Sequence, residues 1–222
     1  MAIRRSSVIG HISGKLEDTV TRYRYGKYIV YSKPDKYNIS HSKEAVIGRA
    51  KFANTVRLAR LLNSFPEISS AWKASKIRGT NGYQKIIKYN AAHASHKGIT
   101  IKNIITPPGS FASLKSLELD ENKIVFNCLA EEEFLSLKPV LFALLSLKNK
   151  GRSKLIMVSS GNVNILGGQN VVAVVELSKT EKRVLTSSRS VIILAAFISY
   201  GNKTKWTSTF SSEIDLKEIN LL

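Results

Sequence analysis

The chain has 222 residues, 43% of them hydrophobic, so it can bury one large core or two smaller ones. Thirty-four Lys and Arg residues face sixteen Asp and Glu residues, and the formal net charge of +18 indicates an anionic partner, either nucleic acid, an acidic protein or a membrane surface. The alternative is a basic surface whose charge serves solubility alone. The single cysteine excludes an internal disulfide, and five prolines and thirteen glycines exclude a fibrous or disordered composition.

The first predicted element is a β-hairpin formed by residues 19–25 and 28–33, which are rich in β-branched and aromatic side chains. Gly26 and Lys27 suit a two-residue turn, which would set Tyr25 opposite Tyr28. Because side chains alternate along a strand, the arginines and most of the tyrosines separate onto two faces. The basic face would carry Arg22, Arg24, Ile29, Tyr31 and Lys33, and the other face Tyr23, Tyr25, Tyr28 and Val30.

Three helices are predicted after the hairpin. The first covers residues 42–62, the second begins at Pro66 as its first turn, and the third covers residues 83–94. An apolar stripe at helical spacing supports the first helix and consists of Phe52, Val56, Ala59 and Leu62.

The composition changes near residue 97, and short strands separated by turn signals follow. The predicted strands are residues 100–105, 114–119, 123–128, 139–147, 154–159, 171–177, 191–199 and 205–210. Residues 161–168 are predicted to form a hairpin turn, because they lack the Gly-Lys-Ser/Thr ending of a phosphate-binding loop.

These elements predict an α+β fold with an N-terminal β-hairpin plus helices, followed by an antiparallel immunoglobulin-like β-sandwich. The predicted domains are a basic hairpin-plus-helices module, residues 1–97, and a β-sandwich domain, residues 98–222. Residues 1–100 hold nineteen Lys and Arg against five Asp and Glu, a net charge of +14, whereas residues 101–222 have a net charge of +4. The asymmetry places the expected anion-binding surface in the N-terminal part.

The candidate site is a basic-aromatic surface for a nucleic-acid backbone, DNA or RNA. Phosphate binding needs several cations that can be approached together, and an exposed aromatic ring can stack on a base. No pattern for base readout is present, so the expected binding is independent of sequence. The candidate residues are Arg4, Arg5, Lys15, Arg22, Arg24, Lys27, Tyr31, Lys33, Arg49, Arg57 and Arg60. The competing interpretation is a half-buried hairpin with solvated arginines and with the tyrosines of the opposite face in a core.

No enzyme activity, cofactor or metal site is expected. His93 and His96 are three residues apart, but no cysteine or carboxylate cluster lies near them in sequence. Cys128 lies in an apolar run, which predicts a buried thiol and not a nucleophile. Residues 131–133 are three glutamates, and such a charge run is typical of a short helix or a solvated loop.

The alternative function is a structural subunit of a self-assembling filament or virion-like particle, formed as a homo-oligomer. Edge strands expose unpaired backbone groups, and a tyrosine-rich hairpin could add to a sheet of another copy. Neither a secretory signal nor an apolar run of about 18 residues is present, so the expected location is the cytoplasm. The alternative implies a virion or a released assembly.

The sequence also resembles a family of small basic bacterial proteins of unknown function. Members share a glycine-rich start, a basic-aromatic hairpin and an Arg-x-Lys-Phe helix, which match Gly10, Gly14, Lys15, Val20, Arg22, Gly26, Lys27, Ser32, Lys33, Pro34, Arg49, Lys51 and Phe52. Residues 83–90 and 196–203 are similar to its aromatic-asparagine helix and its penultimate strand. Glu17 and Asp18 depart from the family, which usually has a glycine there. The resemblance implies a two-part architecture and no catalytic residues.

Overall fold

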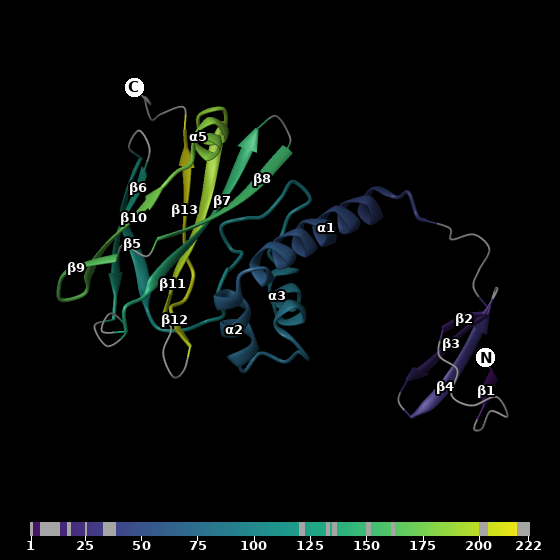
Figure 1. Cartoon of the computed structure of the whole chain (residues 1–222). Helices are drawn as coiled ribbons and strands as arrows, with labels where there is room; N and C mark the ends of the chain where they lie inside the picture. The colour runs from purple at the N-terminus through teal and green to yellow at the C-terminus, as the bar shows by residue number, and fades with distance from the viewer. Residues whose placement is uncertain are drawn as a thin grey trace. The chain divides into compact units, whose positions relative to one another are not determined.

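The computed structural model describes residues 2–4, 14–16, 19–24, 26–32, 39–119, 123–131, 134, 137–149, 152–160, 163–199 and 204–216. The chain divides into two compact units, Met1–Ser42 and Lys43–Leu222 (Figure 1). The sequence predicted this division between residues 97 and 98 instead. The structure moves it to residue 42, because the helices share a hydrophobic core with strands of the second unit.

The first unit is a four-stranded antiparallel sheet in the order β1-β4-β3-β2. Its strands are β1 (Ala2–Arg4), β2 (Gly14–Leu16), β3 (Thr19–Arg24) and β4 (Lys27–Ser32). The predicted hairpin is β3–β4, whereas β1 and β2 are three-residue strands that the sequence did not predict.

The hairpin turn differs from the predicted one. Arg24 lies opposite Lys27, so the turn lies between these two residues and includes Gly26, which adopts the positive φ of 75° that glycine tolerates. The predicted pairing is therefore wrong by two residues. A shift of two residues preserves which side chains share a face, so Arg22 and Tyr31 remain on the same face.

The second unit begins with the three predicted helices, α1 (Lys43–Asn63), α2 (Pro66–Ala74) and α3 (Gly82–Asn90). Pro66 occupies the first turn of α2, as the sequence predicted. Asn81 caps α3, because its side-chain oxygen accepts a hydrogen bond of 2.8 Å from the backbone N–H of Gln84. Among the described helices, none has the length and apolar character that a membrane span requires.

Two antiparallel sheets make up the rest of this unit (Figure 1). The outer sheet has the order β5-β6-β10-β9, from β5 (Ala112–Leu119), β6 (Lys123–Ala130), β9 (Val163–Gly167) and β10 (Asn170–Glu176). The central sheet has the order β12-β11-β7-β8, from β7 (Val140–Asn149), β8 (Arg152–Ser160), β11 (Ser190–Ser199) and β12 (Lys205–Trp206), and β13 (Phe210–Asp215) also pairs with β11. Helix α5 (Lys179–Thr186) connects β10 to β11.

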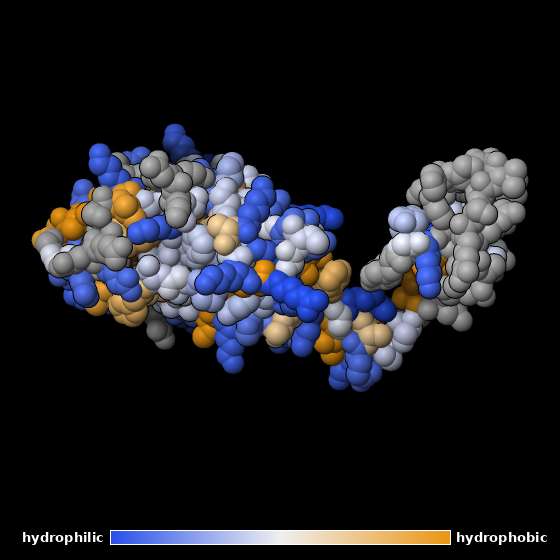
Figure 2. All heavy atoms as spheres, turned by 90° about the horizontal axis from the view of Figure 1, so that it is seen from below, coloured by the Kyte–Doolittle hydropathy of each residue, from blue (hydrophilic) through white to orange (hydrophobic). Residues whose placement is uncertain are grey.

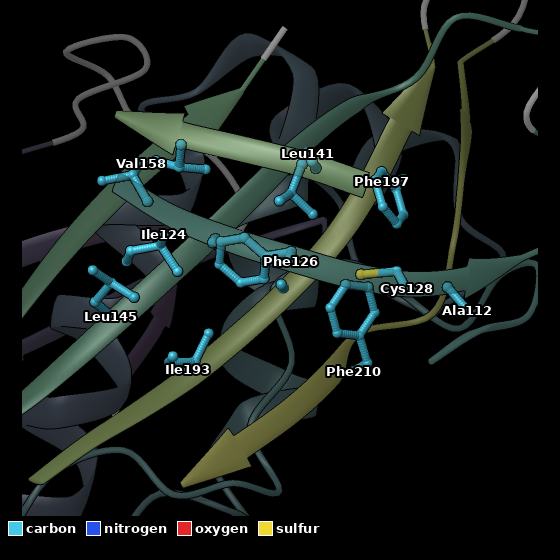
Figure 3. Close-up of a cluster of buried hydrophobic side chains, with 14 of the residues drawn as sticks. Ala112, Ile124, Phe126, Cys128, Leu141, Leu145, Val158, Ile193, Phe197 and Phe210 are labelled. Atoms are coloured by element: carbon cyan, nitrogen blue, oxygen red, sulfur yellow. The ribbon is translucent and has the colours of Figure 1, made fainter. Parts of the chain in front are cut away.

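Strands β7 and β11 supply two hydrophobic cores, one on each face of the central sheet. Their odd-numbered residues pack against the outer sheet, whose contributions include Ile124, Phe126 and Cys128 (Figure 3). Their even-numbered residues, such as Phe142 and Leu194, pack against the helices, with Leu58, Trp72 and Ile86. The second unit therefore has helical, central-sheet and outer-sheet layers, and its two sheets form a sandwich-like arrangement around the first of these cores.

Several predicted elements in this unit are corrected. Residues 100–105 form turns and bends in place of a strand, and residues 205–210 include the short β12 and only the start of β13. Residues 161–168 were predicted as a turn, but β9 occupies 163–167 and the turn is formed by residues 168 and 169. Helix α5 was not predicted.

Candidate nucleic-acid interface

The hairpin of the first unit exposes a basic-aromatic face. Arg22 and Lys27 are exposed, and Tyr31 on the same face is 38% exposed. The guanidinium carbon of Arg22 lies 5.9 Å from the centre of the Tyr31 ring, which is a cation–π distance. The ring therefore orients the arginine and still presents surface on which a base can stack.

The competing interpretation placed the opposite tyrosines in a core. Tyr23, on the face opposite Arg22 and Tyr31, is 59% exposed, so this interpretation is wrong for Tyr23. Five further candidate residues belong to this unit. Strands β1, β2 and β3 contain Arg4, Lys15 and Arg24, of which the backbone alone is described, while Arg5 and Lys33 lie outside the described residues.

In the second unit, the three predicted arginines lie on the exposed side of α1. Arg49 and Arg60 are about three helical turns apart, and Arg57 is one turn from Arg60, so all three share one side of the helix. All three are exposed, whereas Leu58 and Leu62 are buried on the side that faces the core. The structure thus brings these three predicted residues together.

The N-terminal half of α1 is more exposed than the sequence predicted. Ala59 and Leu62 of the predicted apolar stripe are fully buried, but Phe52 is 58% exposed. The first fully buried residue of the helix is Thr55, so the core covers the C-terminal half of α1 and leaves the rest accessible.

One of the three arginines also has a structural contact. Nη1 of Arg57 donates a hydrogen bond of 3.0 Å to the backbone carbonyl of Ser153 in β8. Nearby, the side-chain amide of Asn54 donates to the carbonyls of Ser95 and His96 at 3.0 and 3.3 Å. Arg57 is therefore fixed on the body of the unit, and its remaining guanidinium donors are left for a ligand.

The basic excess of the chain is concentrated in residues 43–102, here called the helical layer. This segment holds twelve Lys and Arg residues against two acidic residues, Glu44 and Glu67, a net charge of +10. Figure 2 shows hydrophilic side chains over much of the visible face, with smaller hydrophobic patches between them. Residues 103–222 have a net charge of only +3, so the helical layer is the main positive region of the second unit.

Lys85 is a basic residue of this layer that is buried and does not contribute to the basic surface. It is 7% exposed, and its ammonium group donates hydrogen bonds of 2.9 and 2.6 Å to the backbone carbonyls of Lys73 and Ser75. These carbonyls lie at the C-terminal end of α2, where a cation also interacts favourably with the helix dipole. Lys85 is therefore a cap of α2.

The predicted cations lack acidic partners in the part of the chain that the structure describes. An ion pair of 2.8 Å joins Lys148 to Glu213 on the central sheet, but no described ion pair involves Arg22, Lys27, Arg49, Arg57 or Arg60. Their charges are consequently not neutralised by described carboxylates. Within each unit, these cations are available to an external anion.

An open pocket of about 260 Å³ lies beside the Lys148–Glu213 ion pair and is also lined by Lys97, Thr100 and Ile192. Because Glu213 compensates Lys148, Lys97 is the one lining residue with an uncompensated charge among the described contacts. A single exposed lysine is a weak anion site compared with the arginines of α1.

The other polar residues singled out by sequence have structural surroundings. Cys128 is 1% exposed, as predicted for a buried thiol, and burial raises its pKa to about 12. His93 packs against Tyr89 with ring centres 6.2 Å apart. Within the described residues, no group of three or more His, Cys, Asp or Glu side chains is arranged to hold a metal ion.

Comparisons with known proteins find no matching family model, no matching curated protein and no matching solved structure. The resemblance to a family of small basic bacterial proteins therefore stays a prediction.

Proposed function

We propose that this protein binds a nucleic-acid backbone, without sequence preference and without catalysing a reaction. One observation carries the proposal: the exposed cations Arg22 and Lys27 in the first unit, and Arg49, Arg57 and Arg60 in the second, have no described carboxylate partner. Free cations that share one face can contact neighbouring phosphates and release the condensed counterions, which favours binding.

The presence of one such surface on each of two units adds to the proposal. Once either surface is bound to a long polyanion, the second contact becomes intramolecular and benefits from a high effective concentration. Binding to long strands should then be tighter than binding to short oligonucleotides that engage one surface alone.

The test is a salt titration of binding to fluorescent DNA and RNA, followed by anisotropy. The variant Arg22→Gln/Arg49→Gln/Arg60→Gln removes three cations from the proposed surfaces. Each lost phosphate contact should reduce the slope of log affinity against log salt by roughly 0.7–0.9.

A matched control removes three exposed cations from the β-rich part, in Lys115→Gln/Lys179→Gln/Arg183→Gln. Both variants lower the net charge equally, so a loss confined to the first variant supports the proposed surfaces. Absence of binding at low salt, or equal losses in the two variants, would contradict the proposal.

The alternative, a structural subunit of a filament or virion-like particle, remains distinct from nucleic-acid binding. Negative-stain imaging of the purified chain with and without nuclease separates the two. Large particles that survive nuclease favour the alternative, whereas particles that disappear with the nucleic acid favour the polyanion-binding function.

We also propose that residues 112–215 form an immunoglobulin-like sandwich. The strand order β5-β6-β10-β9 supports this, because it corresponds to A-B-E-D of the immunoglobulin fold. In the central sheet, β12 and β13 together occupy the position of strand G beside β11, β7 and β8, which correspond to F, C and C′. An experimental structure with a different strand order would reject this assignment.

A further inference from the structure

We propose that strand β9 is an interface for a second copy of this chain, and that two β9 strands pair antiparallel across a two-fold axis at Ile165. The inference extends the outer sheet from one molecule into the next. It concerns the side of the second unit that does not carry the basic helical layer, and it does not depend on nucleic-acid binding.

The position of β9 in the sheet is the first reason. Among the described strands, β9 is the last in the order β5-β6-β10-β9 and pairs with β10 alone. An edge strand presents backbone N–H and C=O groups on its outer side, and another strand can satisfy them. Two of its apolar side chains are also exposed, Ile165 by 49% and Leu166 by 70%.

The lack of charge on this edge is the second reason. Residues 155–175, which include all of β9, contain no Asp, Glu, Lys or Arg, although 23% of the whole chain is charged. Proteins usually protect an exposed edge with lysine, proline, inward-facing charges or a β-bulge. The other edge of the same sheet follows that rule, because β5 carries Lys115 and Glu118. Strand β9 carries neither charge nor proline, so the bulge at Leu166 is the protective feature that the described residues show there.

Charge distribution identifies a second copy as the occupant. A chain with a net charge of +18 repels its own copies unless they meet where charge is absent or balanced. The four strands of the outer sheet carry two lysines and two glutamates, so their formal charge is zero. The outer sheets of two copies can therefore meet without bringing like charges together.

The layer order also keeps the helical layer away from the proposed interface. The central sheet lies between the helical layer and the outer sheet, and packed layers are about 10 Å apart. The helical layer is thus about two Debye lengths from the outer sheet at physiological salt, where one Debye length is about 8 Å. The positive charge of the helical layer is therefore largely screened at the outer sheet, where the two copies meet.

The strand itself fits a two-fold arrangement. With the axis at Ile165, this residue faces Ile165 of the partner subunit. Pairing across a two-fold axis is self-complementary, so it closes as a dimer and does not propagate into a fibre. Ile165 pairs with Val171 and Gly167 pairs with Asn170, so Leu166 forms a bulge in β9. The regular part of the strand is therefore residues 163–165, and we expect an association in the micromolar range.

Sedimentation velocity of the purified chain over the micromolar range tests the proposal. The wild-type chain should show a reversible dimer, and Ile165→Lys should abolish it by placing like charges opposite each other. Leu166→Lys, at the more exposed side chain, should weaken the dimer with less effect on the fold. Thr180→Lys adds the same charge at an exposed position of α5 and should leave the dimer unchanged.

A cross-link tests the register. Residues opposite each other in antiparallel strands have Cβ atoms about 4.5–5.5 Å apart, close to disulfide geometry. Mild oxidation of Ile165→Cys should therefore give a covalent dimer, whereas the Thr180→Cys control should not. The natural Cys128 does not interfere, because it is buried. A wild-type chain that stays monomeric, or a dimer unaffected by Ile165→Lys, overturns the proposal. If the wild-type chain dimerises but does not bind nucleic acid, the proposed function is rejected and the dimer proposal stands.

Discussion

The ammonium nitrogen of Lys85 lies 2.6 Å from the carbonyl oxygen of Ser75, the residue that ends helix α2. A second hydrogen bond of 2.9 Å joins it to the carbonyl of Lys73. A lysine in the most basic part of the chain thus stabilises the fold, so positive charge alone does not identify a binding residue.

Replacing this lysine should affect stability and not nucleic-acid binding. Lys85→Met removes both donors and leaves two helix-end carbonyls without them, and hydrogen bonds involving a charged group contribute about 1.5–3 kcal/mol each. We expect the free energy of unfolding to fall by about 2–4 kcal/mol in urea titrations. Lys88→Met, at an exposed position of the same helix, should change stability by less than about 0.5 kcal/mol. Equal stability of the two variants would show that the buried ammonium group is not a cap.

Tyr31 should contribute to binding of single strands through stacking. Tyr31→Leu should weaken binding of a single-stranded oligonucleotide by about 1–3 kcal/mol while the salt slope stays the same, because no charge is lost. Arg22→Gln should instead reduce that slope. Tyr23→Leu is the matched control, since Tyr23 is an exposed tyrosine on the opposite face of the same hairpin. An equal loss in Tyr23→Leu would contradict the assignment to the Arg22 face.

Ser146 is a buried polar residue whose replacement should raise stability. Its side chain is fully buried in β7, and its hydroxyl oxygen has no hydrogen-bond partner among the described residues. Ser146→Ala removes an unsatisfied polar group and should increase the free energy of unfolding by about 1 kcal/mol. The opposite is expected for Ser199→Ala, because the hydroxyl of Ser199 donates to the carbonyl of Leu137. Chemical denaturation of the two variants measures both changes in the free energy of unfolding. Destabilisation by Ser146→Ala would indicate that the Ser146 hydroxyl group has a hydrogen-bond partner.

The Cys128 thiol should make stability depend on alkaline pH. Burial raises its pKa from 9.0 to about 12, so in this pH interval the folded chain keeps a proton that the unfolded chain releases. The stability linked to this proton is complete below pH 9 and is lost as the pH rises toward 12, by at most about 1.4 kcal/mol per pH unit. Urea unfolding of the wild-type chain and of Cys128→Ala at pH 8 to 10.5 measures how much of the alkaline loss of unfolding free energy comes from the Cys128 thiol. Parallel pH profiles would contradict it.

The predictable part of the fold depends on local patterns. The helical spacing of Ala59 and Leu62 and the proline at residue 66 identified α1 and α2. The run of apolar residues from 191 to 198 identified β11, and a continuous apolar run is typical of a strand buried on both faces. Alternation on the hairpin also placed Arg22 and Tyr31 together, even though the predicted register was shifted.

Local hydrogen bonds explain two errors. Residues 100–105 have strand-like composition, but the Asn103 side chain accepts from the backbone N–H of Thr100 at 2.8 Å and competes with ladder formation. Helix α5 was missed although Ser178 and Glu181 form a capping box, a signal that can be read from the sequence. Recognising this Ser-x-x-Glu spacing would have separated β10 from β11 by a helix.

Other features depend on contacts between distant residues. The hydrogen bond between Arg57 and Ser153 joins positions 96 residues apart, and the burial of Lys85 follows from the packing of α3 against α2. The predicted domain boundary at residue 97 failed for the same reason. The local sequence of β7 and β11 does not specify which elements cover the face that carries their even-numbered residues.

Strands β7 and β11 are buried on both faces, so the central sheet depends on the helices for one of its two hydrophobic cores. A chain shortened to begin at residue 98 would lose Leu58, Trp72 and Ile86 and would expose Phe142, Ile192 and Leu194 to water. Such a fragment would be prone to aggregate, because large apolar patches that are exposed on a sheet face associate with one another. Lys43 is therefore the natural starting point for any fragment of the second unit that is meant to fold independently.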